Sequence, residues 1–428
     1  MLRPSSFTPL GHYLNTSAFV SALIFLLQAH QTHTIAVCSS ECIPSQVHLS
    51  QGPTFESSVV SYTTKCCEED GESVYEPAIY LGTSKDKIDQ QFLGNTHTYT
   101  AGGWQGSLHR VKISGLESST GPAVGDYPVR FVAIADMGAF SDNAGASNST
   151  ISALMGEVHM RTIDRSKDGF PLLIHAGDIA YTSGNQEVWD SYFEEMEVVA
   201  SSGYYQVCVG NHEHYYNFSG YLNRFAMPGE TGNYSVDNLW GSYDYGGVHF
   251  THFSTEHSLK PDSDQIAFLE KDLAKAAENR ASVPWIVVYG HKPLYCSTND
   301  YYDCKIGGPL HIAPAVEHLF QKYEVDLFLA GHLHNYERSF PVYNGTVMSR
   351  SYAPALDTVH MVIGMAGDDE GLTDSWESPQ PSWSAIRHAA LGYGLVEVHN
   401  ASHLHFEYVL SGSGKVFDAF DLVRERSS

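Results

Sequence analysis

The amino-acid sequence predicts a layered α/β domain preceded by a small β-sandwich. From residue 129 onward, apolar runs of strand length alternate with segments of helical periodicity, which is the pattern of layered α/β domains. Residues 43–117 instead contain short alternating runs rich in Ser, Thr, Gly and Val, with no helical period of useful length. A chain of 428 residues is long enough to form both units.

The N-terminus has the pattern of a secretory signal peptide. Residues 18–27 form an apolar run that is too short to span about 30 Å of hydrocarbon as a helix, and Arg3 precedes it. We therefore predict a signal peptide over residues 1–36 and a secreted protein without a stable membrane anchor; an uncleaved anchor is the alternative. Secretion is also supported by five N-x-S/T sequons, at Asn148, Asn217, Asn233, Asn344 and Asn400.

The sandwich is predicted to form from residues 43–117, with 118–128 as a linker rich in Gly, Pro and Ser. Its expected strands are 47–51, 57–63, 76–82 and 109–115.

The second domain is predicted over residues 127–428. Its expected helices are 148–165, 187–200, 263–279 and 312–323. Its expected strands, one of which continues into a loop, are 129–136, 171–178, 204–214, 248–255, 285–291, 325–334, 359–365, 393–400, 403–409 and 414–423. Ser263 is expected to cap the third helix, because its hydroxyl can accept a hydrogen bond from the first turn.

Seven cysteines are present, and an odd number leaves at least one outside an internal disulfide. Cys296 and Cys304 lie close in sequence and are candidates for a local bridge, whereas Cys208 lies in an apolar strand and is expected to be a buried thiol. No C-x-x-C pair occurs, which argues against a zinc ribbon.

The net charge of −25 argues against a nucleic-acid partner, because an acidic surface repels a phosphate backbone. An acidic protein that acts on an anionic ester needs local positive charge, and metal ions held by some of its 23 histidines would supply it.

Five polar motifs follow apolar runs at spacings of about one β-α unit. They are Asp136–Gly138, Gly177–Tyr181, Gly210–Glu213, Gly290–His291 and Gly331–His334. Each motif alone is weak evidence, since a polar residue after a strand is usually part of a turn. Together they indicate one site, because ligand-binding groups converge at the carboxyl ends of the strands in α/β folds.

The residue types at these motifs are those of a two-metal site. Asp136, Asp178, an ionised Tyr181 and His334 form a hard, negatively charged set that suits Fe³⁺. A more neutral set, which shares Asp178 and suits Zn²⁺, Mn²⁺ or Fe²⁺, is completed by Asn211, His291 and His332. One shared carboxylate places two metals about 3.5–4 Å apart, as in two-metal hydrolases.

The series D-x-G, G-D-x-x-Y, G-N-H-E, V-x-x-H and G-H-x-H resembles the motifs of the purple acid phosphatases, a branch of the calcineurin-like metallophosphoesterases. Tyr181, with Gly138 where related phosphoesterases carry a ligating histidine, points to the purple branch. The resemblance covers about residues 127–428 and includes His334–Arg338. It implies a four-layer β-sandwich flanked by helices, preceded by a fibronectin-III-like β-sandwich.

The resemblance also implies the chemistry. Fe(III) would be bound by Asp136, Tyr181 and His334. A divalent metal would be bound by Asn211, His291 and His332, and Asp178 would bridge the two metals. A metal-bound hydroxide would then attack a phosphate monoester in line, with an acidic pH optimum. His212 resembles the family's histidine that binds phosphate or protonates the leaving group. Glu337 and Arg338 are expected to orient His334 or to pair with each other.

Two features depart from the family pattern. The loop Tyr295–Tyr302 lacks the adjacent histidines that contact substrate in plant members, so substrate preference is left open. The sandwich is also shorter than the family's version, and a missing strand would leave an open sheet edge. We expect either that the chain covers this edge in another way or that the sequence lacks a segment.

The prediction is therefore a secreted acid phosphatase acting on small phosphate esters, with a homodimer left open. One alternative is a phosphodiesterase or nucleotide pyrophosphatase on the same scaffold. The other is a secreted binding protein with an inert catalytic domain.

Overall fold

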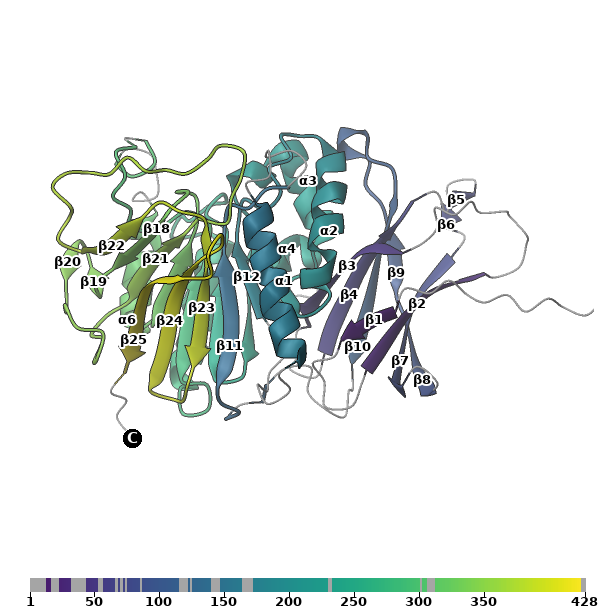
Figure 1. Ribbon diagram of the computed structural model, residues 1–428, viewed down its shortest axis with the longest axis horizontal. Helices are drawn as coiled ribbons and strands as arrows, with labels where there is room; N and C mark the ends of the chain where they lie inside the picture. The colour runs from purple at the N-terminus through teal and green to yellow at the C-terminus, as the bar shows by residue number, and fades with distance from the viewer. Residues whose placement is uncertain are drawn as a thin grey trace, which may run out of the picture.

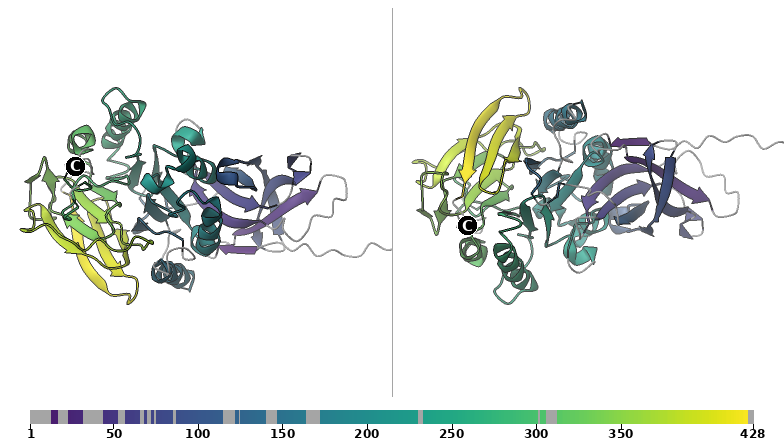
Figure 2. Two further views of the ribbon diagram at one scale, coloured as in Figure 1. Left: turned by 90° about the horizontal axis from the view of Figure 1, so that it is seen from above. Right: turned by 90° about the horizontal axis from the view of Figure 1, so that it is seen from below.

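In the computed structural model of the chain, the described residues are 13–16, 23–31, 44–52, 57–65, 68–69, 72–73, 75–84, 87–114, 122–123, 125–139, 147–163, 172–229, 233–300, 302–305 and 312–424. The molecule is elongated, with the N-terminal strands at one end and the C-terminal strands at the other (Figures 1 and 2).

The N-terminal unit consists of two facing groups of strands. One is the four-stranded sheet β1-β2-β7-β8, formed by Tyr13–Thr16, Leu23–Gln31, Tyr75–Ser84 and Lys87–Leu93. The other is β3-β4-β10-β9, formed by Ser45–Gln51, Ser57–Thr64, Ser107–Ser114 and Asn95–His97. A β-hairpin of β5 (Glu68–Glu69) and β6 (Glu72–Ser73) and the 3₁₀ turn η1 (Ala101–Gly103) complete the unit.

Strand β2 lies within the segment predicted to be a signal peptide. It pairs antiparallel with β7, from Gln31 opposite Tyr75 to Leu26 opposite Tyr80. Apart from β1 and β2, residues 1–36 lie outside the described residues, and secretory cleavage stays a prediction. In the folded chain, β2 covers one edge of β7 and β13 lies beside β3, so the short sandwich leaves neither of these edges open.

The first sheet of the larger domain continues into the sandwich. Its order is β25-β24-β23-β11-β12-β13, followed directly by β3-β4-β10-β9 (Figure 1). The parallel strands are β11 (Val129–Ile134), β12 (Leu172–Ala176) and β13 (Tyr204–Cys208), and the antiparallel strands are β23 (Gly392–Val398), β24 (His403–Leu410) and β25 (Val416–Val423). The two units meet where Tyr204 of β13 pairs in parallel with Leu49 of β3.

The second sheet has the order β14-β15-β16-β17-β21-β18-β22. These strands are Gly241–Tyr245, Val248–His252, Trp285–Tyr289, Leu327–Ala330, Val359–Ile363, Tyr336–Ser339 and Ser384–His388. A β-hairpin of β19 (Val342–Tyr343) and β20 (Thr346–Val347) lies apart from it.

The parallel strands at the centre of both sheets are almost entirely buried, which explains why they are continuous apolar runs. In β11, Phe131 points between the sheets, where it meets Phe250 edge-on at 5.1 Å, whereas Val132 packs against the helical layer. The outer face of the first sheet carries α1 (Asn148–Ile163) and α2 (Gln186–Ala200), and that of the second carries α5 (Asp264–Glu278) and α6 (Ala313–Lys322). The result is the predicted four-layer arrangement.

Ser263 caps α5 as predicted, by accepting a hydrogen bond from the Ile266 amide. Asn185, which was not predicted as a cap, caps α2 by accepting one from the Glu187 amide. The buried face of α2 carries apolar residues three or four positions apart. The two short helices are α3 (Tyr215–Arg224) and α4 (Tyr234–Asp237). Within the described ranges, no helix is long and apolar enough to cross a membrane.

The cysteine predictions are confirmed where the structure describes them. Cys296 and Cys304 form a disulfide, and Cys208 is a buried free thiol in β13. The other four cysteines, Cys38, Cys42, Cys66 and Cys67, lie outside the described residues.

Candidate metal centre

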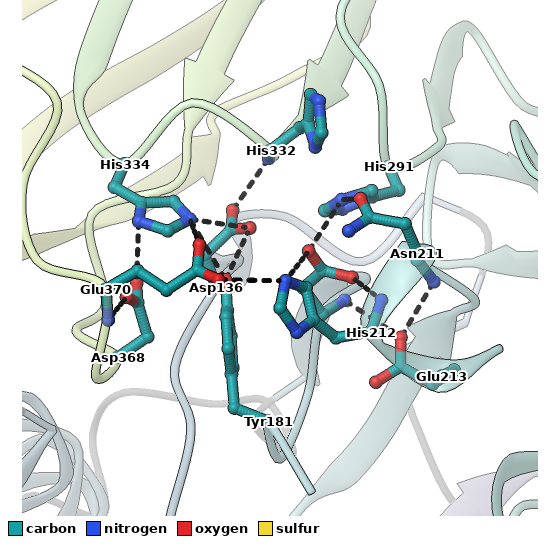
Figure 3. Close-up of polar contacts among 12 residues, drawn as sticks. Asp136, Tyr181, Asn211, His212, Glu213, His291, His332, His334, Asp368 and Glu370 are labelled. Carbon is teal, nitrogen blue, oxygen red and sulfur yellow. Dashed lines mark hydrogen bonds and ion pairs between the residues drawn. The ribbon is translucent and has the colours of Figure 1, made fainter. Parts of the chain in front are cut away.

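The five predicted motifs converge at one end of the two sheets. Three follow β11, β12 and β13 of the first sheet, the last of them forming the 3₁₀ turn η2 (Asn211–Glu213), and two follow β16 and β17 of the second. All eight predicted site residues meet there. Seven are labelled in Figure 3, namely Asp136, Tyr181, Asn211, His212, His291, His332 and His334. The eighth, Asp178, contacts His212 and His291.

The backbone at this end of the sheets is held in an unusual conformation. Asp136, Asp178, Tyr181 and His332 have φ values of 58°, 50°, 49° and 72°. The left-handed region is costly for residues with a Cβ, and such conformations cluster at functional sites. Here it turns each side chain inward directly after a strand.

Glycine is required where the chain passes close to the carboxylates. A Cβ on Gly210 would lie 2.3 Å from Asp178 Oδ1, and one on Gly331 would lie 2.3 Å from Asp136 Oδ2. Both glycines therefore serve close approach, as the G-N-H-E and G-H-L-H motifs predict.

One cluster of potential ligands is formed by Asp136, Tyr181 and His334. The Tyr181 hydroxyl donates to Asp136 Oδ1 at 3.2 Å and lies 3.0 Å from His334 Nε2. His334 Nε2 is 3.7 Å from Asp136 Oδ1. All three side chains are buried.

The second cluster contains Asn211, His291 and His332. His291 Nε2 lies 3.0 Å from Asn211 Oδ1 and 3.0 Å from Asp178 Oδ2. One potential ligand atom from each of Asp178, His291 and His332 lies within 4.8 Å of the others. Asp178 also accepts the His212 amide at 2.7 Å through Oδ1.

Two of the histidines are oriented by backbone carbonyls. His291 Nδ1 donates to the Ala176 carbonyl at 3.1 Å, and His334 Nδ1 donates to the Gly371 carbonyl at 2.8 Å. In the neutral ring this assigns the lone pair to Nε2, which faces oxygen atoms in both cases. Electron-rich nitrogens and oxygens that face one another at about 3 Å are the arrangement that a metal cation stabilises.

The charges of the cluster also favour a cation. Burial raises the pKa of Asp136 to about 7 and, with nearby carboxylates, holds the pKa of Tyr181 well above its usual value. Burial opposes protonation of His291 and His334, but the carboxylates around them prevail and raise both pKa values to about 10. Burial likewise opposes ionisation of Asp178, yet His291 prevails and lowers its pKa.

His212 lies at the accessible side of the centre, with its side chain 22% exposed. Its ring packs over that of Tyr181 at 4.2 Å between centroids. Its Nε2 is 3.4 Å from Glu370 Oε1 and 3.9 Å from Asp178 Oδ2. A group at this place can reach a ligand bound at the centre from the solvent side.

Four carboxylates support the centre beyond the predicted set. Buried Glu213 accepts from the amides of Asp178, Ile179 and Gly210, which ties the second and third motifs together. The others, which contact His332, His334 or His212, are Asp303, Asp368 and Glu370. Asp368 and Glu370 follow the apolar run 359–365, so the rule that identified the other motifs applies to them too.

The expected role of Glu337 and Arg338 is wrong. These residues are consecutive in β18, so their side chains point to opposite faces of the sheet. Glu337 accepts from the Ser297 amide at 2.8 Å, and Arg338 forms a two-point ion pair with Asp418 at 2.7 and 2.9 Å.

Three family models match consecutive parts of the chain. Residues 44–121 match "Purple acid Phosphatase, N-terminal domain", residues 129–336 match "Calcineurin-like phosphoesterase", and residues 357–419 match "Iron/zinc purple acid phosphatase-like protein C".

Individual relatives agree with these models. The chain is 35% identical over 353 residues to acid phosphatase type 7 of Mus musculus, covering 77% of this chain and 74% of that protein. It is 34% identical to "Probable inactive purple acid phosphatase 27" of Arabidopsis thaliana, over 59% of this chain and 43% of that protein. A solved purple acid phosphatase from yellow lupin seeds shares the fold, with a TM-score of 0.76 at 22% identity over 94% of this chain and 80% of that one.

Proposed function

The chain belongs to the purple acid phosphatase family of calcineurin-like phosphoesterases, as its motifs predict, and on that premise we propose that it hydrolyses phosphate monoesters at a two-metal centre with an acidic pH optimum. The observation that carries the proposal is the position of Asp178. Its carboxylate contacts His291 of the second cluster, and its backbone carbonyl accepts the amide of Met137, the residue after Asp136 of the first cluster, at 3.3 Å.

The two clusters provide the ligands in this proposal. Asp136, Tyr181 and His334 would hold Fe³⁺, because a phenolate and carboxylates suit a hard trivalent ion. Asn211, His291 and His332 would hold a divalent metal (Zn²⁺, Mn²⁺ or Fe²⁺), and Asp178 would contribute to both sites. When bound, the pair of metals supplies an acidified water and neutralises charge on the phosphoryl group.

The protein's own groups hold and position this machinery. The backbone carbonyls of Ala176 and Gly371 keep Nε2 of His291 and His334 directed inward. Buried Glu213 holds the amides next to Asp178 in place. His212, at the solvent side, is placed to donate a proton from Nε2 to the leaving oxygen or to bind a phosphoryl oxygen.

Secretion is part of the proposal, and the sequons support it. All five asparagines, Asn148, Asn217, Asn233, Asn344 and Asn400, are exposed, as glycan acceptors must be. Protein secreted by eukaryotic cells should therefore lose apparent mass when an N-glycosidase removes its glycans. An unchanged mass would remove this support.

A visible absorption spectrum together with metal analysis tests the centre. Purified protein should contain iron and show a tyrosinate-to-iron band, and Tyr181→Phe should abolish the band without loss of iron. Tyr343→Phe, in β19, is the matched control and should keep it. A wild-type protein that contains iron but has no such band would refute the role of Tyr181.

Measurements of substrate turnover distinguish the proposed monoesterase from two other functions, a phosphodiesterase and a non-catalytic binding protein. A phosphodiesterase would hydrolyse a diester faster than a monoester, so the ratio of kcat/KM on the two substrates decides between these activities. The second candidate function is a non-catalytic binding protein, and it is considered because one similar Arabidopsis thaliana protein is named a probable inactive purple acid phosphatase. Protein with neither metal nor turnover would favour that second candidate.

A further inference from the structure

His332 is oriented differently from the other two histidines of the centre. Its carboxylate partner engages Nε2, whereas the partners of His291 and His334 engage Nδ1: Asp303 Oδ1 lies 3.0 Å from His332 Nε2. An ionised carboxylate only accepts hydrogen bonds, so Nε2 carries the proton and the lone pair is on Nδ1. His332 therefore offers the opposite nitrogen from His291 and His334.

Asp303 lies on a short loop closed by the Cys296–Cys304 disulfide. It directly precedes Cys304, and the two bridged Cα atoms are 5.5 Å apart. Asp300 Oδ1 accepts the Asp303 amide at 3.0 Å, and the Asp300 carbonyl accepts the Cys304 amide at 3.1 Å. The backbone on both sides of Asp303 is thus tied back onto the loop.

The first part of the loop is fixed to the rest of the domain. The amide and hydroxyl of Ser297 donate to buried Glu337, and the Glu377 amide donates to the Ser297 carbonyl at 2.8 Å. Thr298 forms a β-bridge with Trp376. Because the disulfide links Cys304 to this fixed part of the loop, it also restrains Asp303, the residue before Cys304. The Asp303 side chain itself is 39% exposed.

We propose that Asp303 is a positioning residue for His332, and that the Cys296–Cys304 bridge holds Asp303 in place, so that affinity for the divalent metal depends on a disulfide outside the ligand set. The inference rests on the proposed function, in which His332 is a ligand of that metal. Carboxylate partners of ligating histidines fix the ring and strengthen the ligand, and their loss typically costs about 10–100-fold in metal affinity.

The test measures metal binding directly in the full-length protein. The dissociation constant for Zn²⁺ is determined by competition with a chromophoric chelator, and iron content is determined by elemental analysis. Asp303→Ala should weaken Zn²⁺ binding by about 10–100-fold and leave the iron content unchanged. Asp303→Asn should lose less affinity for Zn²⁺ than Asp303→Ala, because the amide oxygen of asparagine can still accept the hydrogen bond from His332 Nε2. Asp262→Asn, an equal charge change on an exposed loop before α5, should match the wild type.

A double-mutant cycle tests the role of the bridge. Cys296→Ser with Cys304→Ser should weaken Zn²⁺ binding in the wild-type background but add no further loss in the Asp303→Ala background, because both changes act through one contact. Additive losses would show that the bridge acts through another route.

The remaining outcomes separate the two proposals. If Asp303→Ala binds both metals with unchanged affinity, the proposed role of Asp303 is overturned, but the proposed function is not. Parallel loss of iron and Zn²⁺, with a lowered thermal midpoint, would assign Asp303 to loop folding instead of positioning. A wild-type protein that takes up neither metal would overturn the proposed function, and the role of Asp303 with it.

Discussion

Gly210 shows how closely single residues determine the candidate centre. Its backbone is extended, with φ −118° and ψ −174°, so any residue can adopt its conformation. The requirement for glycine is instead steric, because a Cβ would meet the Asp178 backbone nitrogen at 2.5 Å as well as the Asp178 carboxylate. A backbone atom cannot move aside as the end of a flexible side chain can.

Gly210→Ala should therefore both destabilise the protein and reduce metal uptake. We expect a cost of about 1–3 kcal/mol, in the range of other overpacked sites. Gly156→Ala is the matched control, since Gly156 is exposed in α1 and a Cβ there meets nothing within 4 Å. The control should stabilise the helix by up to about 1 kcal/mol. Thermal midpoints and metal content measure both effects; equal behaviour of the two variants would contradict the steric argument.

At the scale of the elements, a charge network around buried His249 fastens α5 to the second sheet. His249 of β15 contacts Asp244 of β14 at 2.7 Å through Nδ1 and Asp272 of α5 at 3.1 Å through Nε2. Thr251 also donates to Asp272, at 2.7 Å. Both ring nitrogens face carboxylates, so the ring is held as an imidazolium. Burial opposes this charge, but the two carboxylates prevail and raise the pKa of His249 to about 9.

This network makes stability depend on pH. The folded-state pKa of His249 exceeds the unfolded value of about 6.5, so its stabilisation is complete below about pH 6.5 and is lost as the pH rises through about 9. His249→Gln should lower the free energy of unfolding by on the order of 2 kcal/mol near pH 6, and by much less near pH 10. The exposed control His403→Gln should show no such difference. Urea unfolding at both pH values provides the measurement, and a loss that does not vary with pH would contradict the charged-network explanation.

The elements themselves followed closely from local sequence. The helix at Asp264–Glu278 combines a serine cap with apolar residues on one face, and both signals are local. Strand β2 was not predicted, because the apolar run that overlaps it has the composition of a signal peptide and its partner β7 lies about fifty residues further along the chain. Pairing between such distant segments leaves no periodic trace in either of them.

The candidate metal centre shows the same difference between contacts that local sequence predicts and contacts that depend on distant parts of the chain. Asp136, Asp178 and the other predicted ligands directly follow apolar strands, so topology alone brings them together. Asp303 carries no comparable signal, since it lies in a loop and reaches His332 only through the folding of that loop. Contacts made by loops depend on the conformation of the intervening chain, which composition and periodicity do not report.

At the scale of the whole molecule, a buried arginine joins the sandwich to the larger domain. Arg224 of α3 forms an ion pair with Asp190 of α2 at 2.8 Å, donates to the Tyr99 hydroxyl at 2.8 Å and lies over the Trp104 ring at 4.7 Å. Trp104 in turn donates to Asp190. Because Tyr99 and Trp104 belong to the sandwich, this one cation is shared by both units.

Arg224→Ala should weaken the junction strongly. Removal of one partner from a buried pair leaves Asp190 without its compensating charge, which typically costs about 3–5 kcal/mol. Lys65, 3.6 Å from Asp190, partly compensates the charge of Asp190, so we expect a cost near the lower end of this range. Exposed Arg350→Ala should change stability by less than about 0.5 kcal/mol. Denaturant unfolding followed by tryptophan fluorescence compares the two; similar midpoints would show that the junction does not rely on Arg224.

The pairing of β2 with β7 gives secretory processing a structural consequence. A peptidase that removes residues 1–36 also removes a neighbour from a ten-residue strand, and the backbone donors and acceptors of that strand then need new partners. The trimmed protein should meet this need by pairing the exposed edge of β7 with the same edge of a second copy, so its mass in multi-angle light scattering should rise toward that of a dimer, while the untrimmed chain stays monomeric. Identical masses for the two forms would show that β7 is satisfied from within its own molecule.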